Sequence, residues 1–150
     1  MPSLPILHRQ QRQQVECLAA CAAMILDYLQ VPVSYETLVK RLRIGYAGAP
    51  FRNLRYLEAL GVSVSIEQGQ IETLRLWLDQ KLPPIAFVAT QALSYWDQVT
   101  QHAVVVVGID HDSVYLHDPN FADAPKIVPI AEFDLAWLEM DEFYALIQTK

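Results

Sequence analysis

Residues 11–29 read QRQQVECLAACAAMILDYL, a polar segment that runs directly into an uncharged, helix-forming one. A polar, basic approach ends at Cys17, and no charged residue occurs from there to Leu26. The alanines in this run favour a helix that begins at Cys17 and ends near Gln30, before the Val-Pro-Val of residues 31–33. A helix that is apolar on every side belongs inside a domain, so we expect it to be the buried centre of the fold.

The composition limits the class of protein. The 150 residues carry 11 basic and 17 acidic side chains, a net charge of −6, which argues against a nucleic-acid partner. With 53% hydrophobic residues, we expect residues 1–150 to form a single domain with a sizeable core. No apolar run reaches the roughly 20 residues that a membrane span needs. Residues 1–15 should form an irregular arm. Because they lack a long apolar core, we do not expect them to be a secretory signal.

The two cysteines indicate a reducing compartment. Cys17 and Cys21 lie about one helical turn apart, where a disulfide between them is sterically poor. We therefore expect a soluble, cytoplasmic protein. Cys21 is flanked by alanines and should belong to the core.

The remaining pattern predicts helices first and strands later. Ser34 should cap a second helix, and a glycine- and proline-containing loop covers residues 45–50. We expect further helices at 52–60, 70–80 and 130–138, strands at 62–67, 85–89, 103–107, 114–116, 126–129 and 143–148, and a turn at 108–113. Short connections between strands favour an α+β fold, with N-terminal helices, the central one starting at Cys17, packed on a mainly antiparallel sheet.

Three residues are candidates for chemistry. Cys17 lies at a helix start, where unpaired N–H groups and the helix dipole favour a thiolate. His102 directly precedes the strand 103–107, and Asp118 ends the strand that should pair with it, so a hairpin brings the two together. Each residue alone has an ordinary explanation: a packed cysteine, a solvated histidine at a strand end, and an Asp-Pro turn.

The combination is more informative than its members. A cysteine at a helix start, then a distant histidine, then a carboxylate is typical of papain-like nucleophilic sites. The imidazole takes the thiol proton, the carboxylate orients the ring, and a further donor joins the Cys17 N–H in stabilising the oxyanion. A glutamine just upstream usually supplies that donor, and Gln10, Gln11, Gln13 and Gln14 are available. Such a site needs neither a metal nor a cofactor.

The segment Gln11–Leu29 resembles the start of the double-glycine-leader peptidase family. These papain-like cysteine peptidase domains trim leader peptides from bacteriocins and are usually fused to a peptide-exporting ABC transporter. In that family an oxyanion-hole glutamine precedes the nucleophile by six residues, which selects Gln11 for Cys17. The family's histidine lies in a His-x-Val-Val-Val-x-Gly-like strand, matched here by residues 102–108, and its carboxylate lies in an Asp-Pro pair, matched by Asp118-Pro119.

The resemblance implies a cysteine peptidase that hydrolyses a peptide bond through a thioester acyl-enzyme, with leader peptides as one substrate class. Its catalytic residues would be Cys17, His102, Asp118 and Gln11. Two positions depart from the family: Leu18 replaces the usual glycine after the nucleophile, and Glu16 replaces the commoner aspartate. No membrane span or ATPase occurs in the 150 residues, so the resemblance is to the peptidase domain alone and identifies no transporter partner.

Three other functions remain to be weighed. A domain with this fold could bind a leader or partner peptide without cutting it, or could pass the acyl group to an amine instead of water. A metal site built from Cys17, His102, His117 and Asp118 is disfavoured, because His117 and Asp118 are adjacent on a strand and should point to opposite faces. The sequence also lacks an HExxH motif and paired CxxC motifs.

Overall fold

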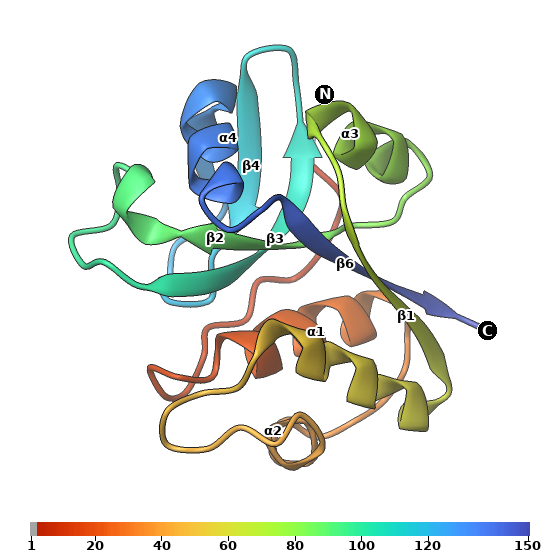
Figure 1. Cartoon of the computed structure of the whole chain (residues 1–150). Coiled ribbons are helices and arrows are strands. Elements are labelled where there is room, and N and C mark those ends of the chain that lie inside the picture. The colour runs from red at the N-terminus through yellow and green to blue at the C-terminus, as the bar shows by residue number, and fades with distance from the viewer. Residues whose placement is uncertain (1–2) are drawn as a thin grey trace.

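The computed structural model describes residues 3–150, so Met1 and Pro2 of the expected arm lie outside the described residues. The chain has an α+β fold, as expected from its sequence (Figure 1). Its elements are α1 (Cys17–Tyr28), α2 (Tyr35–Arg41), η1 (Phe51–Leu60), β1 (Val62–Gln68), α3 (Ile71–Asp79), β2 (Ile85–Ala89), η2 (Thr90–Ala92), β3 (Gln101–Ile109), β4 (Ser113–His117), β5 (Lys126–Pro129), α4 (Ile130–Leu138) and β6 (Phe143–Thr149).

The strands form one sheet of six in the order β1-β6-β2-β3-β4-β5, and every neighbouring pair is antiparallel. Figure 1 shows α1, α2 and η1 on one side of the sheet and α3 and α4 on the other. The strand β3 lies between α1 and α3 and contacts both. Its run of valines, residues 104–107, is therefore buried on both faces, as a continuous apolar strand in the middle of a sheet should be.

The helix α1 is the buried centre of the N-terminal half. Every residue from Leu18 to Leu26 is buried, because small alanines let β3 and α2 approach the helix closely. The Ser34 side chain caps α2 by accepting a hydrogen bond from the Thr37 N–H at 3.1 Å, as predicted. In the part of the chain described, no helix is both long enough and apolar enough to cross a bilayer.

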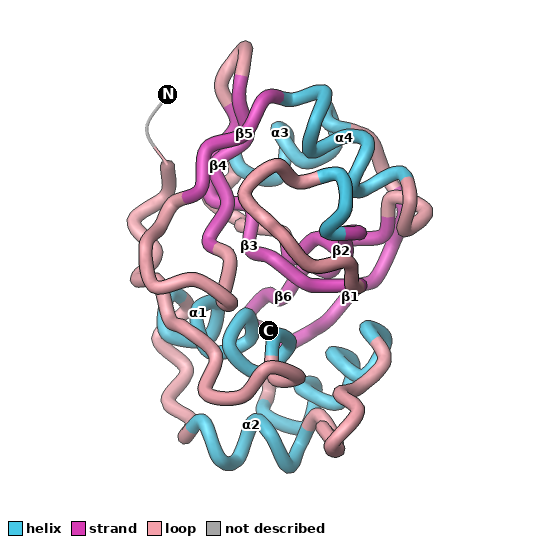
Figure 2. Tube along the Cα trace, turned by 90° about the vertical axis from the view of Figure 1, so that its left-hand side faces the viewer, coloured by secondary structure: helices cyan, strands magenta, loops and turns pink. Residues whose placement is uncertain are grey.

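The N-terminal arm contains no helix or strand between residue 3 and Glu16, but it is fixed to the sheet. The Leu4 N–H donates to the Val107 carbonyl at 2.8 Å, and the Gln11 N–H donates to the Pro119 carbonyl at 2.8 Å. Figure 2 shows the arm passing beside β4 and β5 before it enters α1. The arm therefore holds Gln11 next to the segment that follows Asp118.

Two local predictions differ from the structure. The helix expected at 52–60 is a 3-10 helix, and its buried apolar residues Phe51, Leu54 and Leu57 are spaced by three, which suits three residues per turn. The turn predicted at 108–113 begins later in the structure, because Gly108 lies within β3 at a bulge. A Cβ at Gly108 would lie 3.1 Å from Ser3 Cα, so the glycine admits the N-terminal arm instead of making a turn.

Candidate active site

Cys17 is the first residue of α1, and its side chain is only half-buried. The preceding residue, Glu16, makes no side-chain cap, because its carboxylate accepts a hydrogen bond from the Tyr35 hydroxyl at 3.0 Å instead. No acidic side chain occurs in the first turn either. The thiol therefore lies beside the unpaired N–H groups at the start of α1. No carboxylate of the first turn or of the cap residue offsets their partial positive charge, so this position favours an anion.

His102 and Asp118 form a buried pair. His102 lies in β3 opposite Val88 of β2, and Asp118 directly follows β4, so the β3–β4 hairpin brings them together. The His102 Nε2 and the Asp118 Oδ1 are 2.7 Å apart, and the two side chains are 3% and 0% exposed. Because Nε2 is bound to the carboxylate, Nδ1 is the ring nitrogen left to face Cys17, which lines the same cleft.

The environment stabilises both charged forms of this pair. Burial opposes protonation of His102, but its hydrogen bonds with Asp118 and Cys17 outweigh burial and raise its pKa to about 9. Burial also opposes the charged form of Asp118 and would raise its pKa. Hydrogen bonds from His102 and Tyr95 nevertheless hold that pKa below its usual value. The site thus favours an imidazolium next to a carboxylate, which is the arrangement that supports a nearby thiolate.

The carboxylate of Asp118 has two further neighbours from the β2–β3 connection. The Tyr95 hydroxyl and the Trp96 indole N–H donate to Oδ2 at 2.7 and 2.9 Å. The Asn120 N–H donates to Oδ1 at 3.0 Å, as in a turn in which an aspartate accepts from the backbone two residues on. The sequence alone does not identify Tyr95 and Trp96 as donors. The signal that could have found them is their polar ends, because a buried Tyr hydroxyl or Trp N–H usually has a hydrogen-bond partner.

A cleft of about 470 Å³ opens at Cys17 and His102. Its lining comes from the start of α1, the loop before η1, β2, and the connection into β3. The lining residues are Gln14, Val15, Cys17, Leu18, Ala47, Gly48, Ala49, Pro50, Phe51, Phe87, Trp96, Gln98, Thr100, Gln101, His102, Ala103 and Asn120. His102 is the only member of this set with a basic side chain, and none is acidic, so the cleft suits an uncharged segment of substrate.

Gln11 lies in the arm and points toward the backbone just before α1. Its Nε2 donates to the carbonyls of Gln13 and Gln14 at 3.0 and 2.8 Å, and its buried Oε1 has no hydrogen-bond partner. Its amide N–H groups are therefore occupied in this state, and its role in an oxyanion hole stays a prediction.

The other titratable candidates lie outside this arrangement. Cys21 is fully buried, its thiol donates to the Ala103 carbonyl at 3.5 Å, and burial raises its pKa well above the usual value. His117 turns away from Asp118 and donates from Nε2 to the Ile6 carbonyl at 2.8 Å. Within residues 3–150, no three histidine, cysteine or acidic side chains are grouped to hold a metal ion.

Comparison with known proteins identifies one family whose model matches this chain. The model of the peptidase C39 family matches residues 6–143. No curated protein matches the sequence significantly.

Three solved structures are similar along nearly their whole length. A double glycine motif protease from an AMS/PCAT transporter, solved with its leader peptide, is 21% identical with a TM-score of 0.78, over 99% of this chain and 94% of that one. The peptidase domain of Streptococcus ComA, a bifunctional ABC transporter, is 17% identical with a TM-score of 0.79, over 95% and 98%. The N-terminal peptidase C39-like domain of a Vibrio parahaemolyticus toxin secretion ATP-binding protein is 17% identical with a TM-score of 0.66, over 92% and 99%. At these identities the likeness shows the fold.

Proposed function

We propose that this chain, which belongs to the peptidase C39 family, is a cysteine peptidase that uses Cys17 as its nucleophile. The observation that carries the proposal is the placement of Cys17 and His102 in one cleft, with His102 held by Asp118 at 2.7 Å. A peptide-binding surface alone requires no such arrangement. The same three residue types in this geometry form the nucleophile, base and orienting group of acyl-transfer enzymes.

The reaction begins with proton transfer from Cys17 to Nδ1 of His102. The thiolate attacks the carbonyl carbon of the scissile bond, and the carbonyl π electrons move onto oxygen. His102 then returns the proton to the departing amine, which leaves a thioester on Cys17. Water, deprotonated by His102, attacks the thioester and releases the acid. Throughout, Asp118 holds the ring orientation and stabilises the imidazolium.

We assign stabilisation of the oxyanion to the Cys17 N–H and the Gln11 side chain. Support for Gln11 comes from its position six residues before Cys17 and from the arm that ties it to the Pro119 carbonyl. Its Nε2 currently donates to two backbone carbonyls, so at least one of these bonds must exchange for the oxyanion when substrate binds. Hydrogen bonds at active sites commonly tighten only in the substrate complex.

The proposed substrate is a peptide with small, uncharged residues at the scissile bond. The lining of the cleft supports this, because it contains no acidic side chain and no basic one except His102. A similar structure holds a leader peptide and is a double glycine motif protease, which makes a leader ending in Gly-Gly the first peptide to test. A separate ABC exporter is the corresponding partner, and the cytoplasm is the compartment that keeps a catalytic thiol reduced.

Turnover of a Gly-Gly leader peptide tests the proposal. We expect the wild type and Cys21→Ala to cut the peptide after Gly-Gly and Cys17→Ala to be inactive. Binding without cleavage by the wild type would identify a peptide-binding module instead. Cleavage that yields an amide when a small amine is added, and little free acid without it, would identify an acyl transferase.

A further inference from the structure

The Asp118 carboxylate is saturated with donors. Its Oδ1 accepts from His102 Nε2 and the Asn120 N–H, and its Oδ2 accepts from the Tyr95 hydroxyl and the Trp96 indole, at 2.7, 3.0, 2.7 and 2.9 Å. A carboxylate offers about four lone-pair positions, and these bonds occupy two on each oxygen. With the side chain 0% exposed, no position remains for water to compete with His102.

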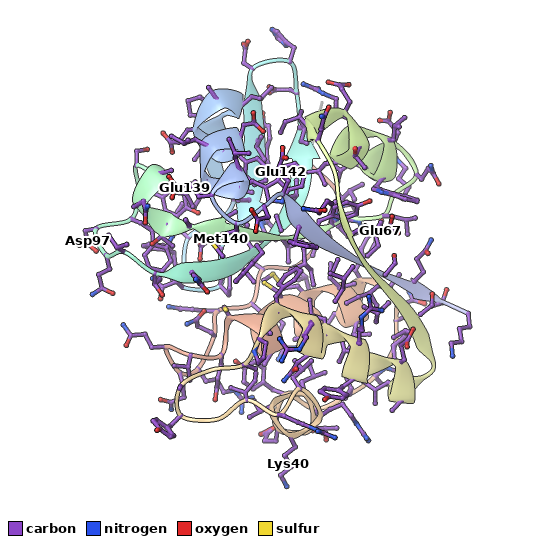
Figure 3. The ribbon with its side chains drawn as sticks, viewed as in Figure 1. Lys40, Glu67, Asp97, Glu139, Met140 and Glu142 are labelled. Atoms are coloured by element: carbon purple, nitrogen blue, oxygen red, sulfur yellow. The ribbon has the colours of Figure 1, made fainter. Side chains whose placement is uncertain are left out.

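The two donors on Oδ2 come from consecutive residues of the β2–β3 connection. The base of this connection is closed, since Thr90 Oγ1 donates to the Gln98 carbonyl at 2.7 Å and accepts from the Thr100 N–H at 2.8 Å. Tyr95 and Trp96 turn inward to Asp118, whereas Asp97 points outward from the tip (Figure 3). The connection therefore presents two neutral donors and keeps its own carboxylate away from the site.

Trp96 contacts both members of the buried pair. Its ring packs against the His102 ring edge to face, with centroids 4.8 Å apart and planes at 66°. Phe121 supports the arrangement from the other side, with ring centroids 5.2 Å from Tyr95 and 5.3 Å from Trp96. The Phe121 carbonyl in turn accepts a 2.6 Å hydrogen bond from His8 Nε2 in the N-terminal arm.

We propose that Tyr95 and Trp96 are positioning residues that hold Asp118 by Oδ2 and so fix Oδ1 on His102 Nε2. A carboxylate held through one oxygen only can rotate about its Cβ–Cγ bond, and the imidazole then loses its defined orientation. Held through both oxygens, it fixes Nδ1 of His102 toward Cys17. We call these two donors the Tyr95–Trp96 clamp. The contribution of the clamp to catalysis rests on the proposed function, whereas its hold on the Asp118 carboxylate does not.

Other charges around the carboxylate do not replace these donors. The titratable groups that act on Asp118 or on the clamp are His102, Tyr95, Cys17, Cys21, Lys126 and Glu132. Burial next to Asp118 raises the pKa of Tyr95, so its hydroxyl stays protonated and remains a donor. Lys126 lies over the Tyr95 ring at 5.4 Å, and its ammonium group donates to Asp123 at 2.8 Å and not to the Asp118 carboxylate.

The test compares Tyr95→Phe and Trp96→Phe with Tyr115→Phe. The control removes a hydroxyl that donates to Asp110 at 2.9 Å, a tyrosine–aspartate bond away from the cleft. The readout is the ¹³C resonance of the Asp118 carboxyl, assigned by its loss in Asp118→Asn and followed against pH. We expect its titration midpoint to rise by about one unit in each site variant and to stay unchanged in the control.

Tyr95→Phe should lower kcat about tenfold with little change in KM, because Tyr95 does not line the cleft and its loss disturbs only orientation. Trp96 does line the cleft, so Trp96→Phe should lower kcat and change KM as well. An Asp118 midpoint equal to that of the wild type in both folded variants would overturn the clamp. If the midpoint rises while the wild type cuts no peptide, the clamp stands and the proposed peptidase function fails. Tyr95→Phe removes only the hydroxyl and keeps the ring, whereas Trp96→Phe removes the indole N–H and also shrinks the ring that packs on His102 and Phe121. Tyr95→Phe is therefore the variant that removes a single donor.

Discussion

His102 and Asp118, sixteen residues apart in sequence, meet through a 2.7 Å hydrogen bond between two almost fully buried side chains. The hairpin of β3 and β4 creates this contact, and α1 brings Cys17 to the other side of the imidazole. The contact joins the fold to the proposed chemistry, because Asp118, which orients the base, is also a buried residue directly after β4. Changes here should therefore alter stability and activity together.

The pairing of His102 with Asp118 should make the free energy of unfolding depend on pH. Folding raises the pKa of His102 from 6.5 to about 9, so the folded state binds the extra proton between these values. Its contribution to the free energy of unfolding is complete below pH 6.5 and is lost as the pH rises through 9. Urea unfolding across this window should show the decline in the wild type. In Asp118→Asn the decline should be smaller, and an equal slope would contradict the pairing.

Two substitutions of Asp118 should lower activity and stability to different extents. Asp118→Asn keeps the size of the side chain but removes the charge that supports the imidazolium, and we expect kcat to fall about 100-fold or more. Asp118→Ala leaves Tyr95, Trp96 and the imidazole without their acceptor, and should destabilise the fold by about 3–5 kcal/mol. Denaturant titration and peptide turnover measure the two effects. Asp110→Ala, which removes a carboxylate near the surface, should leave turnover unchanged.

If Gln11 stabilises the oxyanion, its loss should slow peptide cleavage by Cys17 but not alkylation of the same thiol. Gln11→Ala should lower kcat for peptide cleavage about 100-fold, because it removes one oxyanion donor. Alkylation of Cys17 by iodoacetamide forms no oxyanion and should keep its wild-type rate. Gln13→Ala is the matched control, since that side chain is exposed and only its backbone carbonyl contacts Gln11. Equal turnover in Gln11→Ala and Gln13→Ala would remove Gln11 from the mechanism.

Leu18 should act on both the core and the cleft. It is 4% exposed and lines the cleft beside Cys17, so Leu18→Ala should cost about 2–5 kcal/mol of stability. Leu138→Ala removes a leucine that is 55% exposed and should change stability by at most about 0.5 kcal/mol. A wider cleft should also raise kcat/KM for a peptide with alanine before the scissile bond, relative to Gly-Gly. An unchanged ratio would show that Leu18 does not set specificity.

The main elements of the fold and the contact of His102 with Asp118 were predictable from local pattern. An uncharged, alanine-rich run predicts a buried helix, and a polyvaline strand followed by a turn and a second strand predicts a hairpin. The ends of such a hairpin must lie together, whatever covers them. These arguments need only periodicity and chain connectivity.

The remaining features depend on contacts between distant segments. Gly108 looked like a turn residue, because nothing nearby in sequence shows that Ser3 crosses it. The donors Tyr95 and Trp96 lie in an irregular connection, where no periodicity indicates which way a side chain points. The bonds from Gln11 to the Gln13 and Gln14 carbonyls likewise depend on a turn conformation that composition does not specify.

If His102 activates Cys17 as proposed, the activation should be visible in the alkylation rate of that thiol. With iodoacetamide near neutral pH and mass spectrometry to locate the label, we predict that Cys17 reacts at least about tenfold faster than a model thiol, while buried Cys21 stays unmodified. In His102→Gln the advantage of Cys17 should disappear. A wild-type Cys17 that reacts no faster than the model thiol would contradict the account.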